Sequence, residues 1–200
     1  TDPGAIGRTG LKEKSVTLDI AKRLSSLLRS AGIEVVMVRS TDKFVPLSDR
    51  VNIANQSKAD LFLSIHANTN RVGWLNGFEV YYVSANIDDS RRAMYAANNL
   101  SLNLGSSCFV NPSLDLKAIL WDMIYTYSRA ESIELARSIC HSIDHDLNTR
   151  VLGIKAANFY VLKGVYMPAI LIEVGFLSNY NEERMLKNSY YRQQIASAII

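Results

Sequence analysis

Two short apolar runs most constrain what this chain can fold into. The first run is Leu61–Ile65, which is followed by His66, and the second is Ala169–Ile172, which is followed by Glu173. Runs of this length are typical of strands that are buried on both faces of a helix-covered sheet. In open α/β sheets, ligands gather at the carboxyl ends of the strands. The sequence therefore predicts a histidine and a glutamate at the edge of a buried α/β core.

A helix with one apolar stripe is predicted near the start of the chain. Apolar residues recur at spacings of three and four from about Glu13 to Ala31, and Gly32 is a natural residue to end the helix. The glycine-rich residues 1–11 read as a tight loop that leads into it. Glu13 lies at the helix start, where the helix dipole alone would also favour an acidic residue.

The remaining pattern alternates helices with apolar strands. We expect an α/β fold with a mixed, mostly parallel central sheet flanked by helices. Beyond the two apolar runs, further strands are predicted at 34–39, 77–83 and 159–162, and further helices at 47–56, at 130–147 and from Tyr190 onward.

The alternation breaks at about 84–129. Turn residues there separate two helical segments, 89–102 and 114–127, the second with a broad apolar face. We expect a helical insertion within a single domain that spans 1–200, a length that suits one sizeable core.

Composition narrows the functional classes. The net charge is only +3 and no dense Lys/Arg run occurs, which argues against nucleic-acid binding. No apolar stretch reaches the roughly 18–20 residues that cross a bilayer.

Two cysteines, Cys108 and Cys140, are too few for a disulfide framework, and whether they pair is left open. We expect a monomer.

The residue types at the strand ends indicate metal-assisted hydrolysis. Glu13 and His66 are suitable zinc donors, and Glu173 can serve as the base that accepts a proton from water. The alternatives are a structural role for His66 and an ion pair for Glu173. A carboxylate that follows four apolar residues is costly to bury without a partner, which favours a functional role for Glu173.

Weaker candidates lie nearby. Asn68 follows His66 closely, and Glu79 lies in a similar strand, although alternation there could point Glu79 to solvent. We regard both as candidates for substrate binding. His141 and His145 are four residues apart on a predicted helix, but their polar neighbours favour a solvated face.

Six segments, taken in order, resemble the zinc-dependent N-acetylmuramoyl-L-alanine amidases of bacterial cell walls. They are 2–7, 11–14, 38–42, 47–55, 59–68 and 167–179. The resemblance implies cleavage of the amide between N-acetylmuramic acid and the L-alanine of the peptidoglycan stem peptide. It also implies a location in the bacterial cell envelope, where we expect the periplasm. It also implies that Glu13 and His66 are zinc ligands and that Glu173 is the catalytic glutamate.

The resemblance implies a third zinc ligand that these residues do not contain. In the family this ligand is a histidine in an Asp-Pro-Gly-His-Gly-Gly-like segment, which we expect upstream of Thr1 together with a first core strand. We therefore expect residues 1–200 alone to bind zinc weakly or not at all, and the longer parent chain to be an active amidase.

The predicted insertion at 84–129 resembles a regulatory segment of the amidases that separate daughter cells. The resemblance implies that the segment covers the active site until an activator protein displaces it, with a carboxylate on the zinc. Candidates for that carboxylate are Asp88, Asp89, Asp115, Asp122 and Glu131, whereas Asn98-Asn99 stands where relatives carry a glutamate beside an asparagine. The alternative is a helix packed permanently on the core.

Two other functions fit parts of the pattern. One is a non-catalytic peptidoglycan-binding module that has kept the fold, and the other is a zinc peptidase or deacetylase of similar architecture. The presence of both His66 and Glu173 argues against a decayed site, because a buried carboxylate without a function is costly.

Overall fold

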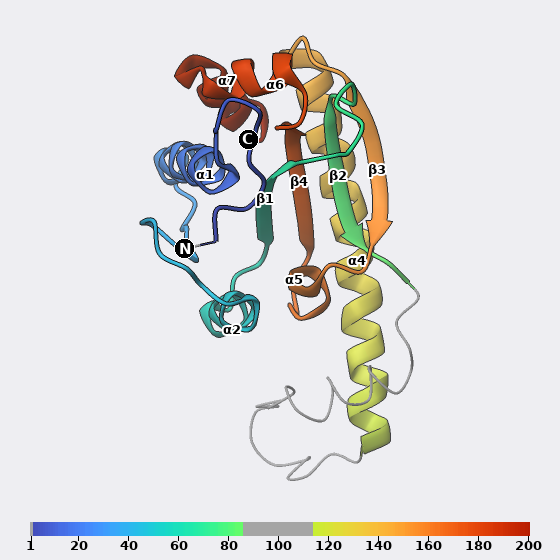
Figure 1. Ribbon diagram of the computed structural model, residues 1–200. Coiled ribbons are helices and arrows are strands. Elements are labelled where there is room, and N and C mark those ends of the chain that lie inside the picture. The colour runs from blue at the N-terminus through green and yellow to red at the C-terminus, as the bar shows by residue number, and fades with distance from the viewer. Residues whose placement is uncertain (1, 86–113) are drawn as a thin grey trace.

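A mixed four-stranded sheet with helices on both faces forms the body of the protein (Figure 1). The computed structural model describes residues 2–85 and 114–200. The strands are β1 (Phe62–Asn68), β2 (Phe78–Val83), β3 (Val151–Ala157) and β4 (Ala169–Phe176). The helices are α1 (Glu13–Ser30), α2 (Leu47–Ser57), α4 (Leu114–Asp146), α5 (Tyr160–Lys163), α6 (Tyr180–Lys187) and α7 (Ser189–Ala198).

The strand order is β1-β4-β2-β3. β1 is parallel to β4, β2 is parallel to β3, and β2 is antiparallel to β4. The expected mixed, mostly parallel sheet is therefore confirmed.

The inner strand β4 is buried at every position. On one face, Ile170, Ile172 and Val174 belong to a core shared with α1, α4 and α7. On the other face, Ala169 and Leu171 pack with residues of α2 and α5. Because side chains alternate along a strand, Glu173 lies on this second face, toward the carboxyl end of β4.

The first helix is fixed at both ends by backbone hydrogen bonds. The N–H groups of Glu13 and Lys14 donate to the carbonyls of Ala5 and Pro3 at 2.9 and 3.2 Å, so the N-terminal loop wraps the helix start. At the other end Gly32 has φ +82°, its N–H bonds the Arg29 carbonyl, and the Ile33 N–H bonds the Leu28 carbonyl. This is a Schellman motif, which confirms the predicted glycine end.

Two adjacent buried glutamates of α6 hold separate parts of the fold together. Glu182 accepts hydrogen bonds from the N–H groups of Gly77 at 2.9 Å and Phe176 at 2.6 Å, joining the start of β2 to the end of β4. Glu183 is fully buried and accepts from the Thr9 hydroxyl at 2.6 Å and from the N–H groups of Thr9 and Leu11 at 3.0 and 3.3 Å. Glu183 thereby fixes the N-terminal loop.

The predicted strand at 34–39 does not form. The segment is irregular, and Ile33 and Val36 are 52% and 53% exposed. The Arg39 guanidinium ties it to α1 by donating to the Lys14 carbonyl at 2.7 Å. A strand needs a neighbour that accepts its backbone hydrogen bonds, and no strand of the described residues pairs with this segment.

One other local prediction was wrong, and two elements were not predicted. The apolar residues 159–162 lie mostly in the short helix α5, because so short an apolar run does not distinguish a buried strand from a buried helical turn. The edge strand β3 was missed because its side chains are at most half-buried, and among the described strands it pairs with β2 alone. The helix α6 was also missed, since its buried face carries Glu182 and Glu183.

The two helices predicted on either side of residue 129 are one continuous helix, α4. Its C-terminal half packs on the sheet through Ala136, Ile139 and Ile143. Figure 1 shows its N-terminal half extending beyond the sheet. The predicted helix at 89–102 and Cys108 lie outside the described residues, whereas Cys140 is a half-buried free thiol. No helix in the described ranges is both long and apolar enough to span a membrane.

We expect Glu183→Ala to lower the free energy of unfolding by about 2 kcal/mol, because three donors in the N-terminal loop lose a charged acceptor that is itself buried. Urea denaturation measures this change. The matched control is Glu134→Ala, which removes an exposed carboxylate paired with Arg137 and should change stability little. Equal stability of the two variants would contradict this role of Glu183.

Candidate functional site

The structure brings Glu13, His66 and Glu173 together at one end of the sheet. His66 and Glu173 are register partners on the parallel strands β1 and β4. The His66 Nδ1 atom lies 2.9 Å from Glu13 Oε1, and His66 Nε2 lies 3.1 Å from the Ser64 hydroxyl. Three segments that are distant in sequence therefore meet at one point.

Glu13 is held as an ionised donor. Its Oε2 accepts a hydrogen bond of 2.8 Å from the Ala5 N–H, which leaves Oε1 facing His66. Burial raises the pKa of Glu13, but the bonds from His66 and Ala5 outweigh this effect and hold it below its usual value. A carboxylate that remains charged beside an imidazole is suited to binding a cation.

Glu173 is shifted in the opposite direction. The residue is only 8% exposed, and its Oε2 is buried without a hydrogen-bond partner among the described residues. Burial raises its pKa to about 7; His66 opposes the shift, and the carboxylates of Glu13 and Glu79 add to it. Two carboxylates whose pKa values are driven apart in one site are typical of distinct chemical roles, and a pKa near 7 suits a general base.

A β-bulge lies immediately beyond this pair. His66 pairs with Glu173, but Asn68 pairs with Phe176, so β4 contains one extra residue there. Gly175 accommodates the bulge with φ +138°, and a Cβ atom at this position would lie 3.3 Å from the Glu182 carboxylate. Bulges of this kind are common beside active sites, where they change the direction of a strand.

Glu79 is a buried neighbour of Glu173, which corrects the alternative that it points to solvent. The two residues are register partners on the antiparallel strands β2 and β4, so they share a face. Glu79 is only 3% exposed; it accepts a hydrogen bond of 2.6 Å from the Tyr81 hydroxyl and pairs with the Lys155 ammonium. Burial and Glu79 raise the pKa of Tyr81.

Sequence reasoning missed Tyr81 and Lys155. Tyr81 lies two residues after Glu79 in the same strand, a spacing that could have identified it. Lys155 gave no such signal, because its place beside Glu79 depends on the pairing of β2 with β3.

The other candidate residues are not part of this cluster. The Asn68 side chain accepts a hydrogen bond of 2.8 Å from the Thr69 N–H. His141 is exposed on α4, and exposed His145 pairs with Asp146 at 2.7 Å, so the predicted solvated face is confirmed. Among the five candidate blocking carboxylates, the structure describes the side chains of Asp122 and Glu131, and both are exposed. Asn98-Asn99 lies outside the described residues.

The cluster contains two residues whose chemistry fits a zinc ion. Glu13 and His66 provide donor atoms of the right chemistry that already converge, and zinc in hydrolases has three protein ligands. Within residues 2–85 and 114–200, no group of three His, Cys, Asp or Glu side chains is placed to hold a metal ion. The described residues therefore fit two of the three ligands.

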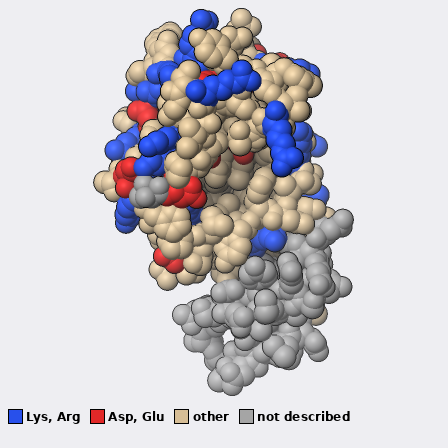
Figure 2. Space-filling view, viewed as in Figure 1, with Lys and Arg blue, Asp and Glu red and all other residues tan. Residues whose placement is uncertain are grey.

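Figure 2 shows that the molecule is hollowed on one face, with acidic side chains inside the hollow and Lys and Arg side chains on the surrounding surface.

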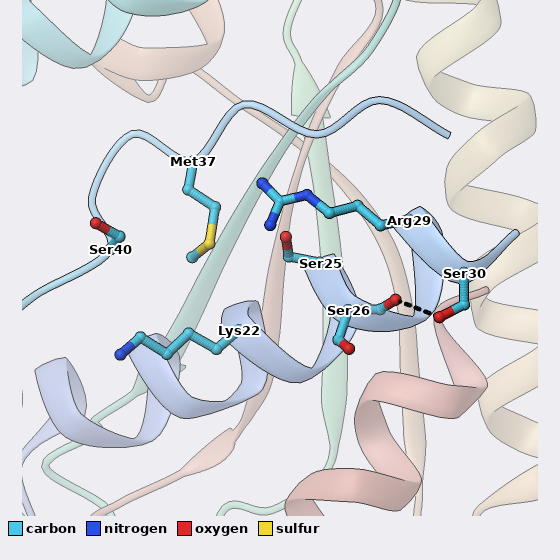
Figure 3. A pocket seen from close by; sticks show the side chains of 7 residues that line it. All are labelled: Lys22, Ser25, Ser26, Arg29, Ser30, Met37 and Ser40. Atoms are coloured by element: carbon cyan, nitrogen blue, oxygen red, sulfur yellow. Dashed lines mark hydrogen bonds between the residues drawn. The ribbon is translucent and has the colours of Figure 1, made fainter. Parts of the chain in front are cut away.

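A separate pocket lies between α1 and the segment that follows it (Figure 3). Its lining is basic and hydroxylic: Lys22, Ser25, Ser26, Arg29, Ser30, Met37 and Ser40. Because this pocket contains no carboxylate or imidazole, it has no general base of the kind that Glu173 offers.

In the metal-free protein, we expect the raised pKa of Glu173 to make stability depend on pH. The folded state holds this proton up to about pH 7, whereas the unfolded chain releases it near 4.5. This contribution to stability is therefore present below 4.5 and is lost as the pH rises through 7, by about 3 kcal/mol.

Urea denaturation from pH 4 to 8 tests this expectation against Glu173→Gln, which keeps the shape but does not titrate. The difference in unfolding free energy between the two proteins should change across this window. A constant difference would contradict the raised pKa.

The chain is similar to known bacterial amidases. A family model described as N-acetylmuramoyl-L-alanine amidase matches residues 1–200. N-acetylmuramoyl-L-alanine amidase AmiA of Escherichia coli K12 is 38% identical over 206 residues, which cover 99% of this chain and 69% of AmiA.

Solved amidase structures share the fold. An N-acetylmuramoyl-L-alanine amidase from Clostridium difficile 630 superposes with a TM-score of 0.75 and 31% identity, over 100% of this chain and 86% of that one. The CwlD amidase from Clostridioides difficile, solved in complex with the GerS lipoprotein, has a TM-score of 0.64 and 25% identity, over 99% and 88% of the two chains.

Proposed function

Because the chain belongs to the N-acetylmuramoyl-L-alanine amidase family, we propose that Glu13 and His66 hold a zinc ion and that Glu173 is the catalytic base. The bond cleaved is the amide between N-acetylmuramic acid and the L-alanine of the peptidoglycan stem peptide. The observation that carries the proposal is the Glu173 Oε2 atom, which is buried and has no hydrogen-bond partner among the described residues. Glu173 is the register partner of His66, and the His66 Nδ1 atom lies 2.9 Å from Glu13 Oε1. Membership of this family favours an amidase over the peptidase and deacetylase alternatives.

Each residue has a separate task. When bound, zinc would polarise the amide carbonyl and lower the pKa of a water molecule toward ~7. Glu173 accepts a proton from the attacking water and delivers it to the leaving nitrogen. Burial favours the protonated form of Glu173, so the proton transfer is not opposed by the surroundings. Ala5 and Ser64 hold Glu13 and His66 in place.

We assign the third zinc ligand to a histidine upstream of Thr1, on a first core strand. Two features of the described residues support such a strand. β1 pairs only with β4, so its other edge carries no neighbour, and the segment at 34–39 pairs with no strand. A strand beside β1 would end near His66, where a third ligand is needed.

We propose Asn68 and Glu79 as substrate-binding residues that act in different ways. Asn68 lies at the open end of β1, two residues after His66 and on the same side of the strand. Glu79 is already engaged by Tyr81 and Lys155, so its contribution is the negative charge that it places beside Glu173.

We propose that residues 84–129 regulate access to the site and that an activator protein docks on α4. Ile119, Met123 and Tyr127 recur every four residues on the N-terminal half of α4 and are 58–65% exposed. Tyr125 instead faces the body, where it is 8% exposed and its hydroxyl donates to the Ser84 carbonyl. An apolar stripe on a helix of this kind suits a groove on a partner. The complex of CwlD with a lipoprotein shows that an amidase of this fold can bind a protein partner.

The assigned roles predict different defects in two variants of the parent chain, with native sequence before Thr1 included. Glu173→Gln should retain zinc and lose at least about 100-fold in wall hydrolysis, because only the base is removed. His66→Ala should lose both zinc and activity. Zinc content by elemental analysis, together with the release of free L-alanine amino groups from purified wall, measures both properties.

Glu134→Gln, on the exposed face of α4, is the matched control and should change neither property. A Glu173→Gln variant that remained active within a few-fold would contradict the assignment of the base.

The regulatory role predicts a gain of function on deletion. Replacing residues 86–121 by a short Gly/Ser linker removes the segment but keeps Tyr125 and its contact with the body. We expect faster wall hydrolysis in the absence of any partner. Activity equal to that of the parent chain would contradict blocking by residues 86–121.

A further inference from the structure

The loop that joins β1 to β2 carries an exposed tryptophan at the end of the candidate site. Trp74 is 70% exposed. Since β4 lies between β1 and β2 in the sheet, the connection from Asn68 to Gly77 must cross the carboxyl end of β4, beyond Glu173. Figure 1 shows this connection passing β4 on its way to β2. Trp74 is therefore on a loop at the carboxyl end of β4, the end toward which Glu173 and its register partner His66 lie.

The backbone that presents Trp74 is anchored. The Trp74 carbonyl accepts hydrogen bonds from the side-chain amides of Asn179 at 3.3 Å and Asn76 at 3.2 Å. The Asn70 N–H donates to the Ser178 hydroxyl at 3.0 Å, and Glu182 holds Gly77 at the other end of the loop. A ligand that contacts Trp74 would therefore find the loop already ordered, which lowers the entropic cost of binding.

The segments that supply the site residues also meet beneath this loop. A Cβ atom at Gly73 would collide with the Arg8 guanidinium and would lie 3.3 Å from the Ser178 carbonyl. Arg8 precedes Glu13 by five residues, and Ser178 follows Glu173 by five residues. Five residues of chain span at most about 18 Å, so Trp74 lies within reach of a polymer bound at the site.

We propose that Trp74 is a stacking platform for a sugar ring of the glycan strand, next to the muramic acid residue whose amide is cleaved. This inference rests on the proposed function, because the scissile amide of peptidoglycan hangs from a glycan that must pass over the rim of the site. Trp74 offers a flat apolar face with one N–H donor, which matches the C–H face of a sugar ring.

The surroundings favour a sugar over a protein partner. The same loop carries the polar residues Asn70, Arg71 and Asn76. The Asn70 Oδ1 accepts from the Val72 N–H and the Asn76 amide donates to the Trp74 carbonyl, which leaves the Asn70 amide N–H groups, the Asn76 Oδ1 and the Arg71 guanidinium to bond the hydroxyl and acetamido groups of a saccharide. A protein hot spot would instead need further apolar residues to exclude water around the ring. Within this loop Val72 is the other exposed large apolar side chain, at 43%.

The first test measures binding without catalysis. Residues 1–200 contain two tryptophans, Trp74 and Trp121, so the difference in emission between the parent protein and its Trp74→Ala variant isolates the indole of Trp74. Adding peptide-free glycan strands should shift and saturably quench its fluorescence. Replacing Trp74 by Ala should weaken glycan binding about tenfold, measured by sedimentation with the strands, and Trp74→Phe should restore part of it.

The second test measures turnover of two substrates. On intact strands Trp74→Ala should raise KM about tenfold and leave kcat within about twofold. On a single N-acetylmuramoyl residue that carries the stem peptide, the variant should match the parent chain. Tyr190→Ala is the matched control, because Tyr190 is also 70% exposed but lies far from the site. Its neighbour Ser189 accepts a hydrogen bond from Arg23, which is about 15 Å along α1 from Glu13.

Unchanged glycan affinity in Trp74→Ala would overturn the proposal, as would an equal loss on both substrates. A Trp74 effect confined to the binding of a protein partner would also overturn it and assign the loop to an interface. If the parent chain and the variant without residues 86–121 both bound glycan through Trp74 but cleaved neither substrate, the amidase assignment would fail and the platform would stand.

Discussion

A carboxylate buried at the end of the inner strand β4 is the constraint on which the rest of this site depends. β4 is buried along its whole length, so Glu173 cannot recover the water that its charge would need. The same burial raises its pKa to about 7, which suits a base at neutral pH. Strand pairing then places His66 and Glu79 beside it, one from each neighbouring strand. The chemistry of the site is thus a consequence of sheet register and desolvation.

The supports of the site come largely from the segment that directly follows β4. Asn179 caps α6 and holds the Trp74 carbonyl, Glu182 joins β2 to β4, and Glu183 fixes the loop that leads to Glu13. Hydrogen bonds from backbone N–H groups to buried carboxylates are strong and directional, so a short helix can order three distant segments. The loop that carries Trp74 and the loop that positions Glu13 therefore share one frame.

The long helix α4 connects this frame to the proposed regulatory segment. Its C-terminal half belongs to the core of the sheet, whereas its N-terminal half exposes an apolar stripe and contacts the body through Tyr125. The sequence patterns predicted one helix on each side of residue 129, but they did not predict that the two form a single continuous helix. Turn signals are absent at that point, so the error came from assigning a boundary to the insertion and not from the local pattern.

Local patterns in the sequence were sufficient to predict β1, β4 and α1, because apolar runs, helical spacing and a terminal glycine act over a few residues. They placed His66 and Glu173 at the strand ends, whereas β1 continues to Asn68 and β4 to Phe176. The tertiary structure alone decided the rest. Pairing with β2 makes β3 a strand despite its half-exposed side chains, whereas 34–39, which pairs with no strand of the described residues, is irregular. The approach of Glu13 to His66, the Lys155 contact with Glu79 and the raised pKa of Glu173 depend on residues that are distant in sequence. Backbone pairing and desolvation are properties of the assembled fold, and no short window of sequence contains them.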